Sequence, residues 1–245
     1  MCCERSLIAA LPRSPQQPRS RILCYHSVGT PEWGVNDVPP DRFRRQIELA
    51  LREGYQFVPA GILAREGAAG DSRRLAITFD DGLRSVAANA APILQEYGIP
   101  WTLFVVSDWA EGRHSFGDDI MLGWGEIERL AVAGATIGSH SVTHPNFGLL
   151  DAPTASHELE ASRETIRQRT GIDAKEFAIP FGQSKNWTDI AAQAASVAGY
   201  ETVYAQSEQR RASGTAPRTF VTRFDGDRVF RASLEGAFDR WEEWL

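Results

Sequence analysis

The chain has 245 residues, 42% of them hydrophobic, and a formal net charge of −6 at pH 7. This length allows one large domain or two small ones, and the acidic balance without any basic run argues against a nucleic-acid-binding protein. No stretch approaches the roughly 18 apolar residues that a membrane-spanning helix needs, so we expect no membrane span.

Residues 1–20 form the first segment of the chain. Their prolines, with several Ser, Gln and Arg residues, are typical of a poorly ordered leader. The apolar stretch near Leu7 is shorter than the core of a secretion signal and follows the acidic Glu4. Cysteines at positions 2, 3 and 24 do not suit a disulfide framework, which favours a reducing, cytoplasmic location. We place the folded domain at 21–245.

From residue 21 onward, short apolar runs alternate with helical patterns. The runs predict strands at 22–25, 55–58, 75–79, 102–106, 135–138, 177–179, 201–204 and 219–224. Periodic apolar positions predict a helix that begins at Asp41 and ends at Gly54, and further helices at 85–97, 125–133, 154–170, 188–198 and 228–244. About eight strands alternating with helices predict an α/β fold, a single domain whose parallel sheet is curled into a distorted (β/α) barrel.

Two polar constellations follow strands of this predicted barrel. Asp80-Asp81-Gly82 comes after the strand 75–79, and His140 and His144 come after the strand 135–138. Active sites of such barrels lie at the C-terminal ends of the strands. Adjacent carboxylates repel one another unless a cation or hydrogen bonds compensate, which suggests a metal. Asp-Asp-Gly is also a common turn, and paired surface histidines are frequent, so the metal prediction depends on the joint occurrence of the two groups.

Two imidazoles and one carboxylate form a ligand set that leaves positions open for water and substrate. The second carboxylate is then free to act as a general base on a water made more acidic by a divalent ion. This combination is suited to the hydrolysis of an amide.

The segments Thr78-Phe79-Asp80-Asp81-Gly82, His140-Ser141-Val142-Thr143-His144-Pro145 and Phe177-Ala178-Ile179-Pro180-Phe181-Gly182 resemble three motifs of the polysaccharide deacetylase family, also known as the NodB-homology domain or carbohydrate esterase family 4. The resemblance covers roughly residues 21–240. It implies Asp80 as general base and Asp81, His140 and His144 as metal ligands. It also implies that Pro180, Phe181 and Gly182 bind substrate, with the backbone N–H of Phe181 as the oxyanion donor.

The chain departs from the family pattern at two points. The third motif often begins with an arginine that orients the catalytic aspartate, and here Ala178 stands in its place. Arg223, at the end of the last predicted strand, is a candidate substitute, although a surface arginine is an equally good interpretation.

The second departure is the absence of histidine after His157, where many family members carry a late histidine that protonates the leaving amine. The segment Ile22-Leu23-Cys24-Tyr25-His26-Ser27 resembles an early segment of the branch that includes poly-N-acetylglucosamine deacetylases. That resemblance implies a place for His26 in the active site, as general acid. The alternative is a loop histidine without a catalytic part.

The resemblance predicts an N-deacetylase that acts on an N-acetylhexosamine unit of a polysaccharide, oligosaccharide or glycan precursor. The expected cofactor is zinc, with cobalt, nickel or manganese as alternatives. Trp109 and Trp187, in predicted loops, are candidates for stacking on a sugar ring. A hydrolase of a non-sugar amide or cyclic imide, and a carbohydrate-binding relative without catalysis, stay open as alternatives. We expect no nucleic-acid partner and make no prediction of an oligomeric state.

Overall fold

A parallel sheet forms the centre of the protein. The computed structural model describes residues 2–10, 20–66, 73–117 and 119–240. Its sheet has eight strands: β1 (Arg21–Tyr25), β2 (Gln56–Phe57), β3 (Arg74–Phe79), β4 (Trp101–Val105), β5 (Thr136–Ser139), β6 (Glu176–Ala178), β7 (Thr202–Tyr204) and β8 (Thr219–Phe220). Each predicted strand is present, and the last one ends at Phe220 instead of residue 224.

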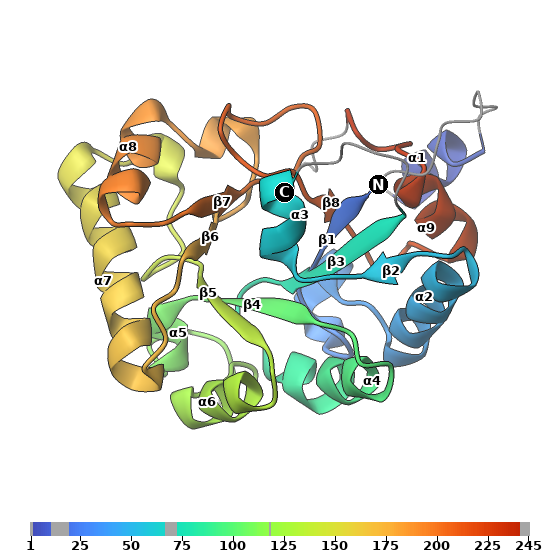
Figure 1. Ribbon diagram of the computed structural model, residues 1–245, viewed down its shortest axis with the longest axis horizontal. Coiled ribbons are helices and arrows are strands. Elements are labelled where there is room, and N and C mark those ends of the chain that lie inside the picture. Colours follow the sequence, from blue (N-terminus) through green and yellow to red (C-terminus); the bar gives the residue numbers. More distant parts are fainter. Residues whose placement is uncertain (1, 11–19, 67–72, 118, 241–245) are drawn as a thin grey trace.

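The strand order makes the sheet curl. Along its main path the order is β7-β6-β5-β4-β3-β1-β8, with β2 paired to β3, and every pair is parallel. An isolated bridge joins Tyr204 of β7 to Ala216, which lies just ahead of β8. Figure 1 shows the strands curled around a common centre. The predicted single-domain distorted barrel is confirmed, with its seam between β7 and the segment that leads into β8.

Helices cover the outside of the sheet. They are α2 (Pro40–Arg52), α4 (Ala91–Glu96), α5 (Ser107–Ala110), α6 (Trp124–Val132), α7 (Ala152–Thr170), α8 (Asp189–Val197) and α9 (Asp227–Leu234) (Figure 1). The largest apolar cluster lies between sheet and helices and includes Tyr25, Phe43, Phe79 and Leu103. Burial of such side chains is the main stabilising contribution to the fold.

Two predicted helices are shorter than expected. Residues 86–90 form a π-helical turn, η2 (Val86–Ala90), and the α-helix begins only at Ala91, because Pro92 has no N–H to continue the ladder of hydrogen bonds. The last helix ends at Leu234 instead of 244, two residues ahead of Gly236, whose φ is +89°. Residues 241–244 of that prediction lie outside the described residues.

The interior of the barrel is small and is closed at one end by α3 (Ala60–Glu66). Alternate residues of a strand point to the same face, so one residue in two faces inward. Ile22, Ala76, Phe104 and Tyr204 meet there with Leu63 of α3. This plug lies at the end of the barrel where the strands begin, which leaves the end where they finish for a polar site.

The N-terminal segment differs from the predicted poorly ordered leader. Residues 2–8 form α1 (Cys2–Ile8), and residues 11–19 lie outside the described residues. Arg5 of this helix is 1% exposed, and its guanidinium donates to both carboxylate oxygens of Asp225, at 2.9 and 2.6 Å. It also lies over the ring of Phe238, 4.2 Å from the ring centroid. A buried ion pair thus ties this helix to the segment that follows β8.

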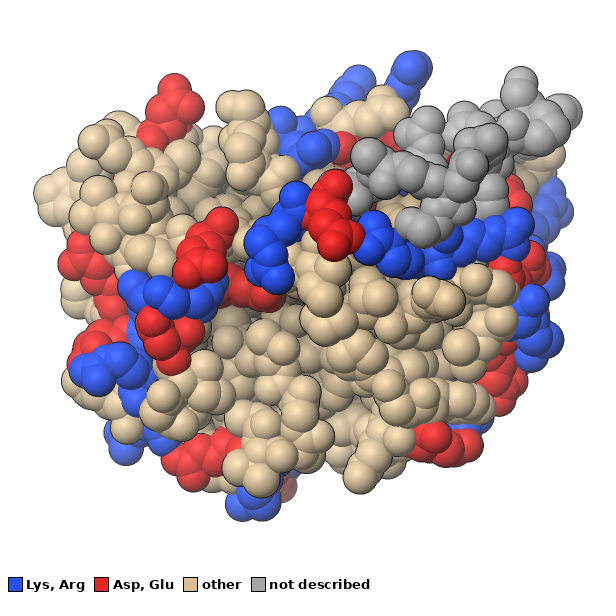
Figure 2. All heavy atoms as spheres, viewed as in Figure 1, with Lys and Arg blue, Asp and Glu red and all other residues tan. Residues whose placement is uncertain are grey.

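The face seen in Figure 2 carries acidic and basic side chains close to one another, around a broad uncharged area. No single sign of charge dominates this face, in keeping with the mixed composition of the chain. Among the described residues, no helix combines the length and the apolar character needed to cross a membrane.

Candidate active site

A pocket of about 330 Å³ opens where the strands end. Its volume lies in the range of ligand-binding clefts. The predicted site residues that line it are His26, Asp80, Asp81, Trp109, His140, His144 and Phe181. They follow β1, β3, β4, β5 and β6, so the curl of the sheet brings together segments far apart in the sequence.

One wall of the pocket presents three donor atoms that converge. Oδ1 of Asp81 lies 3.6 Å from Nε2 of His140 and 3.6 Å from Nε2 of His144. This oxygen is buried, and it makes no hydrogen bond within the described part of the chain. Donor atoms on a common tetrahedral zinc ion are about 3.4 Å apart, given bonds of about 2.0–2.2 Å. The three residues therefore fit a divalent cation, as the sequence predicts.

Local structure aims these donors inward. Asp81 and His144 have left-handed backbones, with φ of +73° and +62°. Such strained conformations cluster at functional sites. Nδ1 of His140 lies 2.8 Å from the carbonyl oxygen of Ala178, which leaves Nε2 to face the pocket. The backbone N–H of His144 donates to Oγ of Ser141 at 2.9 Å. Bonds of this kind orient metal ligands in proteins.

The second oxygen of Asp81 has a partner that sequence reasoning missed. Nε1 of Trp33 donates to Oδ2 of Asp81 at 3.2 Å, from the turn η1 (Pro31–Asn36) that follows β1. Trp33 packs edge-on against Phe116, which in turn contacts Trp109. Trp109 stacks on His144 with ring centroids 5.2 Å apart. An aromatic wall thus supports the donor set from outside.

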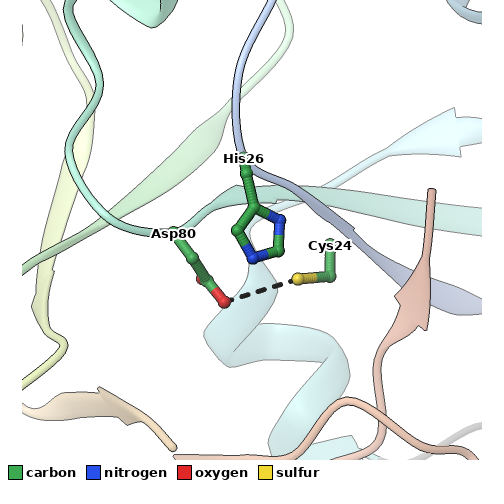
Figure 3. Close-up of side chains that lie close together, drawn as sticks. All are labelled: Cys24, His26 and Asp80. Carbon is green, nitrogen blue, oxygen red and sulfur yellow. Dashed lines mark hydrogen bonds between the residues drawn. The ribbon is translucent and has the colours of Figure 1, made fainter. Parts of the chain in front are cut away.

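Asp80 lies beside the donor set in a different environment. The guanidinium of Arg218 donates to Oδ1 of Asp80 at 2.6 Å and to Oδ2 at 2.8 Å, and all of these side chains are buried. The thiol of Cys24 donates to Oδ2 at 3.4 Å (Figure 3). Arg218 has two further bonds: Nε donates to the carbonyl oxygen of Ala205, and Nη1 donates to Oγ1 of Thr78. Asp80 is therefore held in one orientation.

The two neighbouring aspartates have opposite pKa shifts. Burial raises the pKa of Asp81 to about 8, and the negative charge of Asp80 adds to that shift. Burial acts on Asp80 too, but the positive charge of Arg218 outweighs it together with His140, and the pKa of Asp80 falls well below its usual range. Asp80 is therefore ionised at neutral pH, whereas Asp81 needs a cation to stay so.

His26 lies on the same side of the pocket as Asp80. Its ring packs edge-on against Phe220, with centroids 5.4 Å apart. Burial lowers the pKa of His26 to about 4, although the charge of Asp80 partly opposes the shift. The imidazole is thus neutral near pH 7 and can donate a proton only after it receives one.

The residues predicted to bind substrate and the oxyanion lie in and beside the pocket. Phe181 lines the pocket with φ of +63° and packs its ring edge-on against His144, 4.7 Å between centroids. Pro180 and Gly182 flank it, and both are buried. A side chain at Gly182 would approach Cβ of Gln206 to 2.5 Å, so glycine is required where these two segments meet.

Two candidates from the sequence do not reach the pocket. Trp187 is buried against Phe147 and Phe177 in a separate core, because the turn η4 (Ser184–Asn186) folds this supposed loop inward. Arg223 lies beyond the short β8, and its guanidinium donates to the carbonyl oxygen of Gly34 at 3.4 Å. Arg218, and not Arg223, orients the carboxylate of Asp80.

Comparisons with known proteins agree with this architecture. Residues 67–203, more than half of the chain, match the family model described as Polysaccharide deacetylase. The putative polysaccharide deacetylase YxkH of Bacillus subtilis is 22% identical over 183 residues, covering 74% of this chain and 62% of YxkH. The uncharacterized protein YlxY of the same species is 32% identical over 103 residues, 42% of this chain and 29% of YlxY. The chain thus matches less than two thirds of the length of these curated relatives.

Two solved structures show the same fold. The Streptococcus pyogenes deacetylase PplD, in complex with acetate, superposes with a TM-score of 0.74 at 20% identity, over 88% of this chain and 98% of PplD. IcaB from Ammonifex degensii has a TM-score of 0.72 at 20% identity, over 89% and 98% of the two chains. The family match and the fold lead to one assignment: this chain belongs to the polysaccharide deacetylase family, whose members are hydrolases that act on carbon–nitrogen bonds other than peptide bonds.

Proposed function

We propose that the chain is a metal-dependent N-deacetylase that removes acetate from an N-acetylhexosamine unit of a polysaccharide, oligosaccharide or glycan precursor. The observation that carries this proposal is a buried Asp81 oxygen, without a partner in the described part of the chain, that lies beside two imidazole nitrogens and next to an ionised carboxylate. Relatives support the substrate class: a chitooligosaccharide deacetylase of Rhizobium leguminosarum is 25% identical over 100 residues, 40% of this chain and 42% of that protein.

Asp81, His140 and His144 would hold the cation, for which we expect zinc, with cobalt, nickel or manganese as alternatives. When bound there, a divalent cation supplies Lewis-acid activation of the substrate carbonyl and of water. The neutral imidazoles suit this role, because burial lowers the pKa of both His140 and His144.

Asp80 is the proposed general base. Arg218 keeps its carboxylate ionised and fixes its plane, so the carboxylate is ready to take a proton from the attacking water. The bidentate Arg218–Asp80 pair takes over the role of the orienting arginine that many family members carry at the position of Ala178. It also favours catalysis over the alternative of a carbohydrate-binding relative without activity.

His26 and Phe181 are the proposed partners at the leaving and oxyanion sides. A proton taken up by Asp80 can pass to the neutral imidazole of His26, which faces Asp80 in Figure 3, and then to the amine nitrogen as the C–N bond breaks. The backbone N–H of Phe181, which donates to no described residue, is the proposed donor to the oxyanion. Pro180 and Gly182 hold that N–H in place, and Trp109 is the proposed stacking surface for the sugar.

Acetate release by the purified protein tests the proposal. We expect release from N-acetylated chitooligosaccharides or glycan intermediates, loss of release with a chelator, and recovery on adding zinc or cobalt. Turnover of cyclic imides in place of sugars would move the substrate to the non-sugar alternative. Absence of turnover on every acetylated substrate, with metal bound, would contradict the proposal.

A further inference from the structure

A second cluster of possible donor atoms lies on the other side of Asp80. Cys24, His26 and Asp80 each offer one atom within 4.8 Å of the other two, and all three residues are buried. Figure 3 shows one imidazole nitrogen of His26 directed toward the space between the sulfur of Cys24 and the carboxylate of Asp80. None of these residues belongs to the Asp81–His140–His144 set.

The sheet itself builds this cluster. Cys24 and His26 are two residues apart on β1 and just after it, so their side chains share the inward face. The register pairs Tyr25 with Phe79, and the N–H of Asp80 donates to the carbonyl oxygen of Tyr25 at 3.0 Å. The three donor atoms are therefore positioned before any ligand arrives.

His26 leaves one nitrogen available for a ligand in this cluster. The residue is only 7% exposed, and Nε2, which faces the other two donors in Figure 3, makes no hydrogen bond within the described ranges. Nδ1 points away from them and is buried without a partner among the described residues. Nε2 is therefore free to bind a cation held between it, Cys24 and Asp80.

We propose that Cys24, His26 and Asp80 form a second cation site, selective for thiophilic divalent cations such as Zn²⁺ and Cd²⁺. Sγ of Cys24 and Oδ2 of Asp80 are 3.4 Å apart. On a tetrahedral zinc ion, with Zn–S of about 2.3 Å and Zn–O of about 2.0 Å, these atoms would be about 3.5 Å apart. The cation replaces the thiol proton, which leaves to solvent, and Oδ2 keeps its bond to Arg218.

Occupation of this site inhibits the enzyme, a consequence that rests on the proposed function. The cation engages the general base and His26 together. The positive charge of Arg218 opposes a cation here, so the first equivalent of metal binds at Asp81, His140 and His144. Excess zinc then inhibits, whereas Mn²⁺, which prefers oxygen ligands, does not.

Cadmium binding tests the site without reference to activity. In a Cys2→Ser/Cys3→Ser background, which leaves Cys24 as the remaining thiol, we expect two Cd²⁺ per chain and an ultraviolet cadmium–thiolate band that grows with the second. Cys24→Ser should retain one Cd²⁺ and lose the band. One Cd²⁺ per chain without a band would overturn the proposal.

If circular dichroism shows that Cys24→Ser does not fold, His26→Gln tests the second cation site in its place. Loss of a direct ligand should weaken the second Cd²⁺ by at least about 100-fold, since even outer partners of ligands contribute about 10- to 100-fold. An unchanged second affinity would exclude His26 from the site and refute the proposal.

Zinc titration of acetate release tests the inhibition. With Cys2→Ser/Cys3→Ser we expect a rise with the first equivalent and a fall at excess zinc. Cys24→Ser, scaled to its own maximum, should need at least about tenfold more zinc for the same fall. An equal fall in both proteins contradicts the inhibitory role. A protein without any deacetylase activity defeats the proposed function but leaves the cadmium result to decide the site.

Discussion

The two sides of the pocket are built on different principles. On one side, Asp81 and His144 of the donor set have left-handed backbones, and the oxygen of Asp81 that faces His140 and His144 has no hydrogen-bond partner among the described residues. On the other side, Asp80 is held by the buried fork of Arg218, which comes from the barrel wall. The charge of Asp80 is thus balanced within the protein by Arg218, whereas the charge of Asp81 is left for a bound cation to balance.

Replacing one residue on each side of the pocket gives the largest expected difference in metal content and turnover between the two sides. Asp80→Asn should lower turnover by about 10³- to 10⁴-fold, because the base is removed, while metal content stays at the wild-type level. His140→Ala should lose both metal and turnover. Metal analysis with acetate release checks the pair, and equal metal loss in the two variants would contradict the division of roles.

Arg218→Met removes the counter-charge from the base side. Arg218 keeps the folded-state pKa of Asp80 low, so the pair stabilises the protein above the ordinary pKa of an aspartate and loses that effect as the pH falls. Without Arg218, burial raises the pKa of Asp80, and the acid limb of the pH–rate profile should move to higher pH. We expect a loss of about 10²- to 10³-fold at neutral pH, and of about 3–5 kcal/mol in the free energy of unfolding.

Arg5→Met is the matched control for this variant. It breaks the buried Arg5–Asp225 pair, neither member of which bonds to Asp80, and should destabilise the protein without moving the pH–rate profile. If both variants keep the wild-type acid limb, Arg218 contributes stability alone.

His26→Gln asks whether the base side also delivers the proton to the amine. Loss of that transfer should lower the rate by about 10²-fold with unchanged binding of the first metal equivalent. His157→Gln, on the exposed face of α7, is the control and should match the wild type. A wild-type rate for His26→Gln would take His26 out of the mechanism.

Trp33→Phe has the smallest expected effect and acts on the donor side. It keeps an aromatic ring against Phe116 but removes the donor to Oδ2 of Asp81. Metal affinity should weaken by about 10- to 100-fold, and the rate should recover as metal is added. Trp124→Phe, which loses an indole bond to Glu111 outside the pocket, should leave the affinity unchanged. An unaltered affinity in Trp33→Phe would mean that the indole does not orient Asp81.

The site residues that could be predicted from the sequence are those that lie in short segments directly after a strand. Asp80, Asp81, His140 and His144 lie in two short segments after strands, and hydrophobic patterning located those strands to within a residue or two. Arg218 escaped it because its partner lies 138 positions earlier and depends on how the sheet closes. Arg223 was chosen on a strand prediction four residues too long. Period-two alternation along β1 places Cys24 on the same inward face as His26, so the sequence does contain a signal for Cys24.

Closure of the barrel determines the order in which the folding chain acquires metal binding and catalysis. The isolated bridge at Ala216 joins the last segment to β7, and Arg218 follows two residues later. A chain whose segment beyond β7 has not yet docked would already possess its chelating side chains, yet its base would have no counter-charge. Maturation should therefore confer metal capture first and hydrolysis last.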